Sequence, residues 1–247
     1  MFLRKSSDSV PIAITIDMEW APGYAVRWMG ERLRENSVKA TFFATDPAEI
    51  AYIRQFPELF ELGIHPNFLP GSDHGETMEE VFSYCMKLVP EAVSMRTHCL
   101  VQSTPILRKA LDLTPIENDC SLLLPFISNV SGHKLYLGAA RPLNRFPFVW
   151  EDDVTQMTPS MDWSLNCIPT QNKYLMVNFH PLTVYLNDAS GEGYRNLKQA
   201  NPKISNTTKE AADKLISSGP GPQKTFLEII TAAKNNSVMV KELGEKL

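Results

Sequence analysis

The chain has 247 residues and a formal net charge of −4 at pH 7, with a pI near 5.8. This length suits one α/β domain, and we expect a single domain over residues 1–247. The acidic balance and the lack of a long Lys/Arg cluster argue against a nucleic-acid partner.

The amino-terminal residues, Met1-Phe-Leu-Arg-Lys, become charged after three positions and lack the apolar core of a signal peptide. No later apolar run approaches the ~20 residues that a membrane-spanning helix needs. The cysteines are far apart and form no C-x-x-C pair, which is typical of reduced thiols. They are Cys85, Cys99, Cys120 and Cys167. We therefore expect a cytoplasmic protein without a membrane span.

The first half of the chain alternates between strand and helix patterns. Residues 10–16 form a β-branched, nearly continuous apolar run, as in a strand that is covered on both faces. Residues 24–35 carry apolar side chains at helical spacing, and 39–44 and 59–64 are further strand-like segments. Repeated strand–helix units predict a parallel sheet or barrel.

Two helix starts have clear capping patterns. Thr77-Met-Glu-Glu80 is a capping box followed by apolar residues at helical spacing. Ser103-Thr-Pro105 opens a second helix, with proline where its missing N–H costs nothing.

The remainder of the chain is less regular until a late strand. Residues 119–172 are rich in Pro, Ser and Asn and predict short pieces and loops, whereas 174–179 is again a strand. A polar excursion at 187–206 and helices at 208–217 and 222–235 complete the predicted fold.

Chemically competent side chains follow several of the predicted strands. Asp17 and Glu19 are two residues apart and project from the same face at the end of the first strand. His65 follows the third strand, Arg96 follows residues 92–95, and His180 follows the late strand. Barrel enzymes place their chemistry at the carboxyl ends of strands, so these residues are candidates for one site. Taken alone, the acid pair is as well explained by a solvated strand end, and a capped strand end is the alternative for His180.

The order of five segments resembles the motifs of polysaccharide deacetylases, which form carbohydrate esterase family 4. The segments are Thr15-Ile-Asp-Met-Glu-Trp20, Ala40-Thr-Phe-Phe43, Glu61-Leu-Gly-Ile-His65, Met95-Arg96 and Asn178-Phe-His180. The resemblance covers residues 10–185 and implies a distorted (β/α)7, TIM-like barrel. It is closest to divergent deacetylases of bacterial surface-polysaccharide, or O-antigen, biosynthesis.

Two of the motifs depart from the family pattern. The first motif is usually Thr-Phe-Asp-Asp-Gly, in which the first aspartate is the base and the second binds metal. Aligned in this way, Asp17 is the general base and Glu19 replaces the metal-binding aspartate, although the two roles could be exchanged. The family's His-x-x-x-His would put a second histidine where Leu69 stands, so His74 in the same loop is the candidate replacement. One carboxylate and two histidines, Glu19, His65 and His74, then suit Zn²⁺ or another divalent transition metal.

The resemblance assigns the other roles as well. Arg96 is expected to pair with Asp17 and hold it ionised and oriented, and His180 to protonate the leaving amine. Trp20, His98 and Trp150 are expected to line the sugar pocket, although structural roles explain His98 and Trp150 as well.

The implied function is metal-dependent removal of an N-acetyl group from an amino sugar of a bacterial surface polysaccharide or its precursor. A carbohydrate is the expected substrate. Two alternatives stay open: a sugar-binding protein that has kept the fold and lost catalysis, and a hydrolase of another non-peptide C–N bond.

Overall fold

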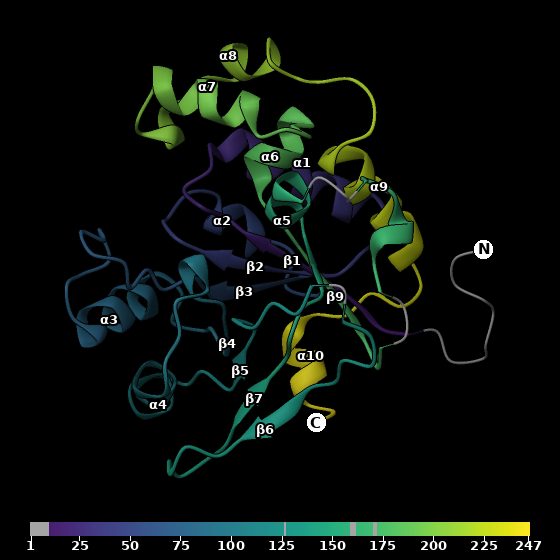
Figure 1. Cartoon of the computed structure of the whole chain (residues 1–247). Coiled ribbons are helices and arrows are strands. Elements are labelled where there is room, and N and C mark those ends of the chain that lie inside the picture. The colour runs from purple at the N-terminus through teal and green to yellow at the C-terminus, as the bar shows by residue number, and fades with distance from the viewer. Residues whose placement is uncertain (1–9, 126, 159–161, 170–171) are drawn as a thin grey trace.

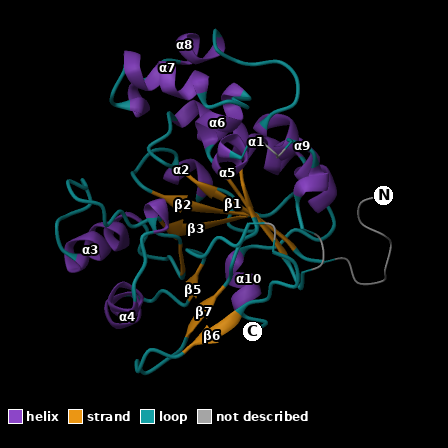
Figure 2. Cartoon of the chain, in the orientation of Figure 1, coloured by secondary structure: helices purple, strands orange, loops and turns teal. Residues whose placement is uncertain are grey.

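Parallel strands form the centre of the molecule (Figures 1 and 2). The computed structural model describes residues 10–125, 127–158, 162–169 and 172–247. The sheet order is β6-β7-β5-β4-β3-β2-β1-β9-β8, and among these neighbours only β6 and β7 are antiparallel. The strands are β1 (Ile12–Asp17), β2 (Ala40–Ala44), β3 (Phe60–Ile64), β4 (Ser94–Met95), β5 (Asn118–Asp119), β6 (His133–Leu135), β7 (Leu143–Arg145), β8 (Trp150–Glu151) and β9 (Leu175–Phe179).

The sheet closes on itself through one stretch of chain, residues 143–151. Its first part pairs with β5 and the residues after it, since Phe148 N–H donates to the Leu122 carbonyl at 2.9 Å. Its last part pairs with β9, in the register Trp150 to Val177. Because β7 and β8 belong to the same stretch, the strands make a distorted seven-stranded barrel, and the predicted fold class is confirmed.

Helices surround this barrel (Figure 1). They are α1 (Gly23–Glu35), α2 (Ile50–Ile53), α3 (Met78–Leu88), α4 (Thr104–Leu113), α5 (Asp152–Met157), α6 (Pro181–Leu186), α7 (Glu192–Ala200), α8 (Lys209–Asp213), α9 (Pro222–Ala233) and α10 (Val240–Gly244). Short 3₁₀ turns occupy His98–Leu100, Leu165–Cys167 and Ile204–Asn206. In the part of the chain that is described, no helix has the length and apolar character needed to cross a bilayer.

Local sequence explains the best-predicted helices. The Thr77 side chain accepts from Glu80 N–H at the start of α3, and the Glu80 carboxylate accepts from Thr77 N–H, which completes the predicted capping box. At the start of α4, the Ser103 side chain accepts from Ile106 N–H. The polar segment 187–206 differs from expectation because it contains the helix α7. This helix buries only Leu197, so its sequence has few apolar residues from which a helix could be predicted.

The end of the barrel where the strands begin is closed by α10. The backbone N–H of Val240 donates to Thr41 Oγ1 on β2, and that of Lys241 donates to the Glu61 carboxylate on β3. Ser94 of β4 also donates to Glu61. Cavities lie at the other end, where the strands finish.

Candidate active site

The carboxyl ends of four strands bring the predicted residues together. Asp17 is the last residue of β1, and His65, Arg96 and His180 directly follow β3, β4 and β9. These four side chains are buried or nearly so. Parallel strands finish at the same end of a barrel, which is why residues so distant in sequence meet here.

Glu19 reaches the site through an unusual turn. Glu19 and Trp20 have φ values of +50° and +51°, which lie in the left-handed region that non-glycine residues rarely adopt. Each such residue costs roughly 1–2 kcal/mol. The buried Met18 packs into the core and anchors the start of this turn. Strained backbone of this kind is concentrated at functional sites in proteins.

One oxygen of Glu19 meets two imidazoles. Glu19 Oε1 lies 2.9 Å from His65 Nε2 and 2.7 Å from His98 Nδ1. The three groups offer ligand atoms that all lie within 4.8 Å of one another. Burial raises the pKa of Glu19, but hydrogen bonds from His65 and His98 outweigh it and hold that pKa well below its usual range. Glu19 is therefore a carboxylate that faces two histidines.

His98 is held in place by the loop that follows β3. Its backbone N–H donates to the Pro66 carbonyl at 2.9 Å, which ties the turn after β4 to the residue after His65. Cys99 and Leu100, directly after His98, also have left-handed φ values of +51° and +54°. This turn presents the His98 ring to Glu19.

His74 lies apart from this cluster. Its Nε2 donates to the Thr45 carbonyl at 2.9 Å, and its Nδ1 accepts from Asn67 N–H at 3.2 Å. The ring stacks on Tyr84, with 4.4 Å between centroids. Both ring nitrogens are thus engaged in holding the loop together, and the structure brings His98, not His74, to Glu19 and His65.

Asp17 belongs to a buried network centred on Arg96. Arg96 Nη1 lies 3.1 Å from Asp17 Oδ1 and also donates to the side chain of Asn178. Asn178 in turn donates to Asp17 Oδ2 at 2.9 Å. The guanidinium lies between the rings of Phe43 and Phe148, 4.9 and 4.2 Å from their centroids. Arg96 and Asn178 therefore fix both oxygens of Asp17.

Asn178 received no role from the sequence. It lies two residues before His180 on β9, and strand alternation puts the two side chains on the same face. That spacing is the signal that could have identified it.

His180 is oriented by an acidic turn at the end of β8. Asp152 accepts from the His180 backbone N–H at 2.9 Å and lies 2.6 Å from Nδ1 of the same residue. Asp153 Oδ1 is 3.5 Å from that nitrogen. Burial lowers the pKa of His180, but the carboxylates of Asp153 and Asp152 outweigh it and raise that pKa well above its usual value. The acidic turn therefore favours the protonated form of the His180 ring.

Burial also raises the pKa values of two nearby acids, that of Glu151 to about 7 and that of Asp153 to about 6. Glu151 accepts from Asn178 at 3.2 Å, so it extends the network that holds Asp17. Neither acid received a role from the sequence.

The two tryptophans expected in the sugar pocket differ in location. Trp20 lies half-buried at the site, with its ring 5.2 Å from that of His98 and its indole N–H donated to Asp73. Trp150 is 2% exposed and packs against Phe179 and Trp163 in the core. The structure thus places Trp20 and His98 at the site and Trp150 away from it, because the Trp150 side chain points into the core while Glu151, the next residue, points to the site.

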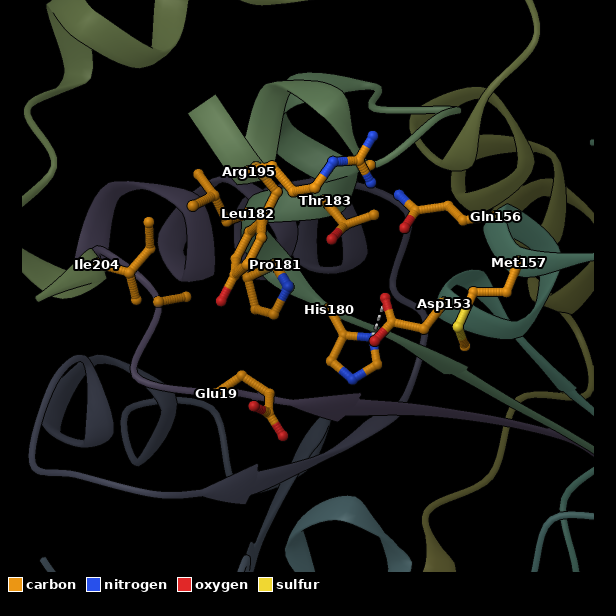
Figure 3. Close-up of a pocket in the computed structure, with 13 residues that line it drawn as sticks. Glu19, Asp153, Gln156, Met157, His180, Pro181, Leu182, Thr183, Arg195 and Ile204 are labelled. Carbon is orange, nitrogen blue, oxygen red and sulfur yellow. Dashed lines mark ion pairs between the residues drawn. The ribbon is translucent and has the colours of Figure 1, made fainter. Parts of the chain in front are cut away.

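Two cavities open on these residues, with volumes of about 260 and 290 Å³. Glu19, Tyr194 and Ile204 line both of them. His180 and Asp153 border the first cavity (Figure 3), and Trp20 and His98 border the second. Helix α7 and the residues after it form the outer wall of both.

Known proteins share this fold and sequence pattern. The family model of the WbmS-like polysaccharide deacetylases matches residues 14–198. A solved protein from Bordetella bronchiseptica, assigned as a polysaccharide deacetylase involved in O-antigen biosynthesis, is 29% identical. That match has a TM-score of 0.77 and covers 91% of this chain and 90% of the other. No protein with a curated description matches the chain by sequence.

More distant structures are similar at a lower level. A family 4 carbohydrate esterase from Bacillus anthracis is 15% identical, with a TM-score of 0.46 and coverage of 96% of this chain and 83% of the other. A family 4 acetyl xylan esterase from Clostridium thermocellum, solved with a cobalt ion, is 11% identical, with a TM-score of 0.47 and coverage of 95% and 90%. These two similarities are too weak to inform the chemistry of this chain.

The family model spans most of the chain, so the protein belongs to the WbmS-like polysaccharide deacetylases. The family resemblance inferred from the five segments is confirmed.

Proposed function

We propose that the protein is a metal-dependent hydrolase that removes an N-acetyl group from an amino sugar of a bacterial surface polysaccharide or its precursor. The observation that carries this proposal is the convergence of Glu19, His65 and His98 beside Asp17 and His180. Family membership and the similarity to the Bordetella protein support the same activity. A cytoplasmic site of action stays a prediction of the cysteine pattern.

The proposed metal ligands are Glu19, His65 and His98, with His98 in place of the His74 expected from the sequence. One carboxylate and two imidazoles are a donor set that suits Zn²⁺. His65 Nδ1 is buried without a hydrogen-bond partner, so this ring is not fully satisfied by protein groups. When bound, a divalent metal would polarise the acetamide carbonyl and lower the pKa of water.

Asp17 is proposed as the general base. One of its oxygens lies within 4.8 Å of a carboxylate oxygen of Glu19 and of a ring nitrogen of His180, so one substrate amide can contact all three groups. Arg96 and Asn178 hold the Asp17 carboxylate in one orientation, ready to accept a proton from the attacking water. The exchanged assignment, in which Asp17 binds metal, is less favoured because both of its oxygens already have partners.

His180 is proposed as the general acid. Its raised pKa favours the protonated ring, and Asp152 holds Nδ1, which leaves Nε2, 3.7 Å from Glu151 Oε1, to act on the substrate. Nε2 can then donate its proton to the departing amine nitrogen. The products are acetate and a free amino sugar.

The test combines metal analysis with acetate release from N-acetylated sugars. We expect the purified protein to hold one divalent transition metal per chain and to release acetate. His98→Ala should lose most of the metal and the activity. His74→Ala should retain the metal, and His133→Ala, at an exposed histidine outside the site, is the matched control.

Two results would contradict parts of this proposal. Full metal occupancy in His98→Ala together with its loss in His74→Ala would return His74 to the ligand set. Stable metal binding without turnover of any acylated sugar would favour a binding protein, and turnover restricted to another class of amide would favour the other hydrolase.

A further inference from the structure

Helix α7 supplies the outer wall of the site, and it carries cations there. Tyr194 and Arg195 line the cavity that contains His180, and Lys198 lines the neighbouring cavity together with Lys203. Lys198 is four residues after Tyr194 and three after Arg195, spacings that bring its side chain close to each of theirs on α7. Seen in Figure 1, α7 lies beside α6, the helix that follows His180.

These cations have no acidic partners among the described residues. No carboxylate oxygen in that part of the chain lies within 4.0 Å of a side-chain nitrogen of Arg195, Lys198 or Lys203. Arg195 makes one hydrogen bond, from Nη2 to the Ser190 carbonyl at 3.2 Å, and so keeps most of its donors free. This concentration of unpaired cations occurs in a chain whose net charge is −4.

The acids of the same cavity are already matched. Glu19 faces His65 and His98, and Asp153 Oδ1 lies 3.5 Å from His180 Nδ1. Arg195 therefore lines this cavity without an oppositely charged partner. Figure 3 shows its guanidinium beside Gln156, on the side of the cavity away from Glu19.

We infer that Arg195 binds an anionic group, a carboxylate or a phosphate, on the sugar whose acetamide lies at His180. The planar guanidinium can donate two parallel hydrogen bonds to either group. Lys198 and Lys203 line the neighbouring cavity together with Asp73, whose charge offsets part of theirs, so Arg195 is the residue on which the recognition of the anion depends. The inference rests on the proposed function, because it takes the bound molecule to be the deacetylation substrate, and it narrows the substrate to an acidic sugar or a sugar phosphate.

The first experiment measures binding without catalysis. Glucose, glucuronic acid and glucose 1-phosphate contain no amide to hydrolyse, and calorimetric or NMR titration of the metal-loaded protein gives their Kd values. At least one acidic probe should bind about 10-fold or more tightly than glucose, since a charge-assisted hydrogen bond is worth that much. If glucuronic acid binds more tightly than glucose 1-phosphate, the preferred anionic group is a carboxylate. The reverse order identifies a phosphate.

Variants at Arg195 test the residue itself. Arg195→Gln should abolish the preference for the acidic probe and leave glucose binding unchanged, while Arg195→Lys should restore part of the preference. Lys234→Gln, at an exposed lysine beyond the end of α9, is the matched control and should behave like the parent. Equal affinities for all three probes, or an unchanged preference in Arg195→Gln, would overturn the inference.

Acetate release separates this inference from the proposed function. If the acidic probe binds better but no N-acetyl sugar is hydrolysed, the anion subsite stands and the deacetylase assignment fails. If neutral and acidic N-acetyl sugars are hydrolysed with equal kcat/KM, the deacetylase assignment stands and the anion subsite fails.

Discussion

Asp152 couples the end of β8 to the candidate general acid. Its two oxygens contact both the backbone N–H and Nδ1 of His180, so it fixes the position of the ring and its charge at once. The side chain is fully buried, which strengthens the interaction of its charge with the imidazole. A residue of this kind acts through His180 and does not need to touch the substrate.

The charge of Asp152 should set the alkaline limit of activity. Asp152→Asn keeps the shape but removes one of the carboxylates that raise the pKa of His180. The ring then loses its proton at lower pH, so the alkaline limb of the kcat profile should move to lower pH by roughly one unit. Asp112→Asn, at an exposed and distant aspartate, should leave the profile unchanged. An alkaline limb that does not move in Asp152→Asn would argue against His180 as the acid.

At the scale of elements, residues at the amino terminus of α3 determine where this helix begins. The capping box at Thr77 satisfies backbone N–H groups at both Thr77 and Glu80. The same helix carries Tyr84 and Cys85, which contact His74. This helix therefore supports the loop after β3 without supplying a proposed metal ligand.

Removing the cap should cost stability and leave metal binding intact. Thr77→Ala should lower the free energy of unfolding in urea by about 1 kcal/mol, because the Glu80 N–H loses its acceptor. Thr77→Ser keeps the hydroxyl and should stay close to the parent. Metal content should be equal in all three proteins; a loss of metal in Thr77→Ala would link α3 to the metal site and favour His74 as a ligand.

At the scale of the whole molecule, the candidate site lies where the barrel strands finish, and Glu61 lies at the opposite end, which α10 closes. Glu61 is 4% exposed and accepts hydrogen bonds from Thr41, Ser94 and the backbone of Lys241. Burial raises the pKa of Glu61, although these hydrogen bonds oppose the rise. Glu61 thus joins β3 to β2, β4 and α10 through one carboxyl group.

Glu61 should make stability depend on pH. Because its pKa is higher in the folded than in the unfolded chain, the folded state binds the proton more tightly. Its contribution is fully present below the unfolded pKa and is lost as pH rises through the folded pKa. The unfolding free energy of the parent minus that of Glu61→Gln should therefore fall with rising pH in this window, by up to about 1.4 kcal/mol per unit. Glu245→Gln, at an exposed position directly after α10, is the control; a flat difference for Glu61→Gln would contradict the expectation.

The sequence by itself determined the barrel and the positions of most of its chemistry. Strand and helix periodicity predicted the major elements, and the carboxyl ends of parallel strands must lie together, so Asp17, His65, Arg96 and His180 could be assigned to one site. The capping roles of Thr77 and Ser103 were also predictable from the sequence, because a cap depends on neighbours within one helical turn.

Tertiary structure decided which side chains occupy the positions that loops control. The choice of His98 over His74 depends on hydrogen bonds across loops, to Pro66 for one and to Thr45 for the other, which spacing along the chain does not encode. Trp150 lies in the core because it packs against Phe179, and α7 lines a cavity together with Glu19 and Asp153, which are distant from it in sequence. Local patterns fix elements through contacts within a few residues, whereas the direction of a loop side chain follows from partners that only the folded chain brings near.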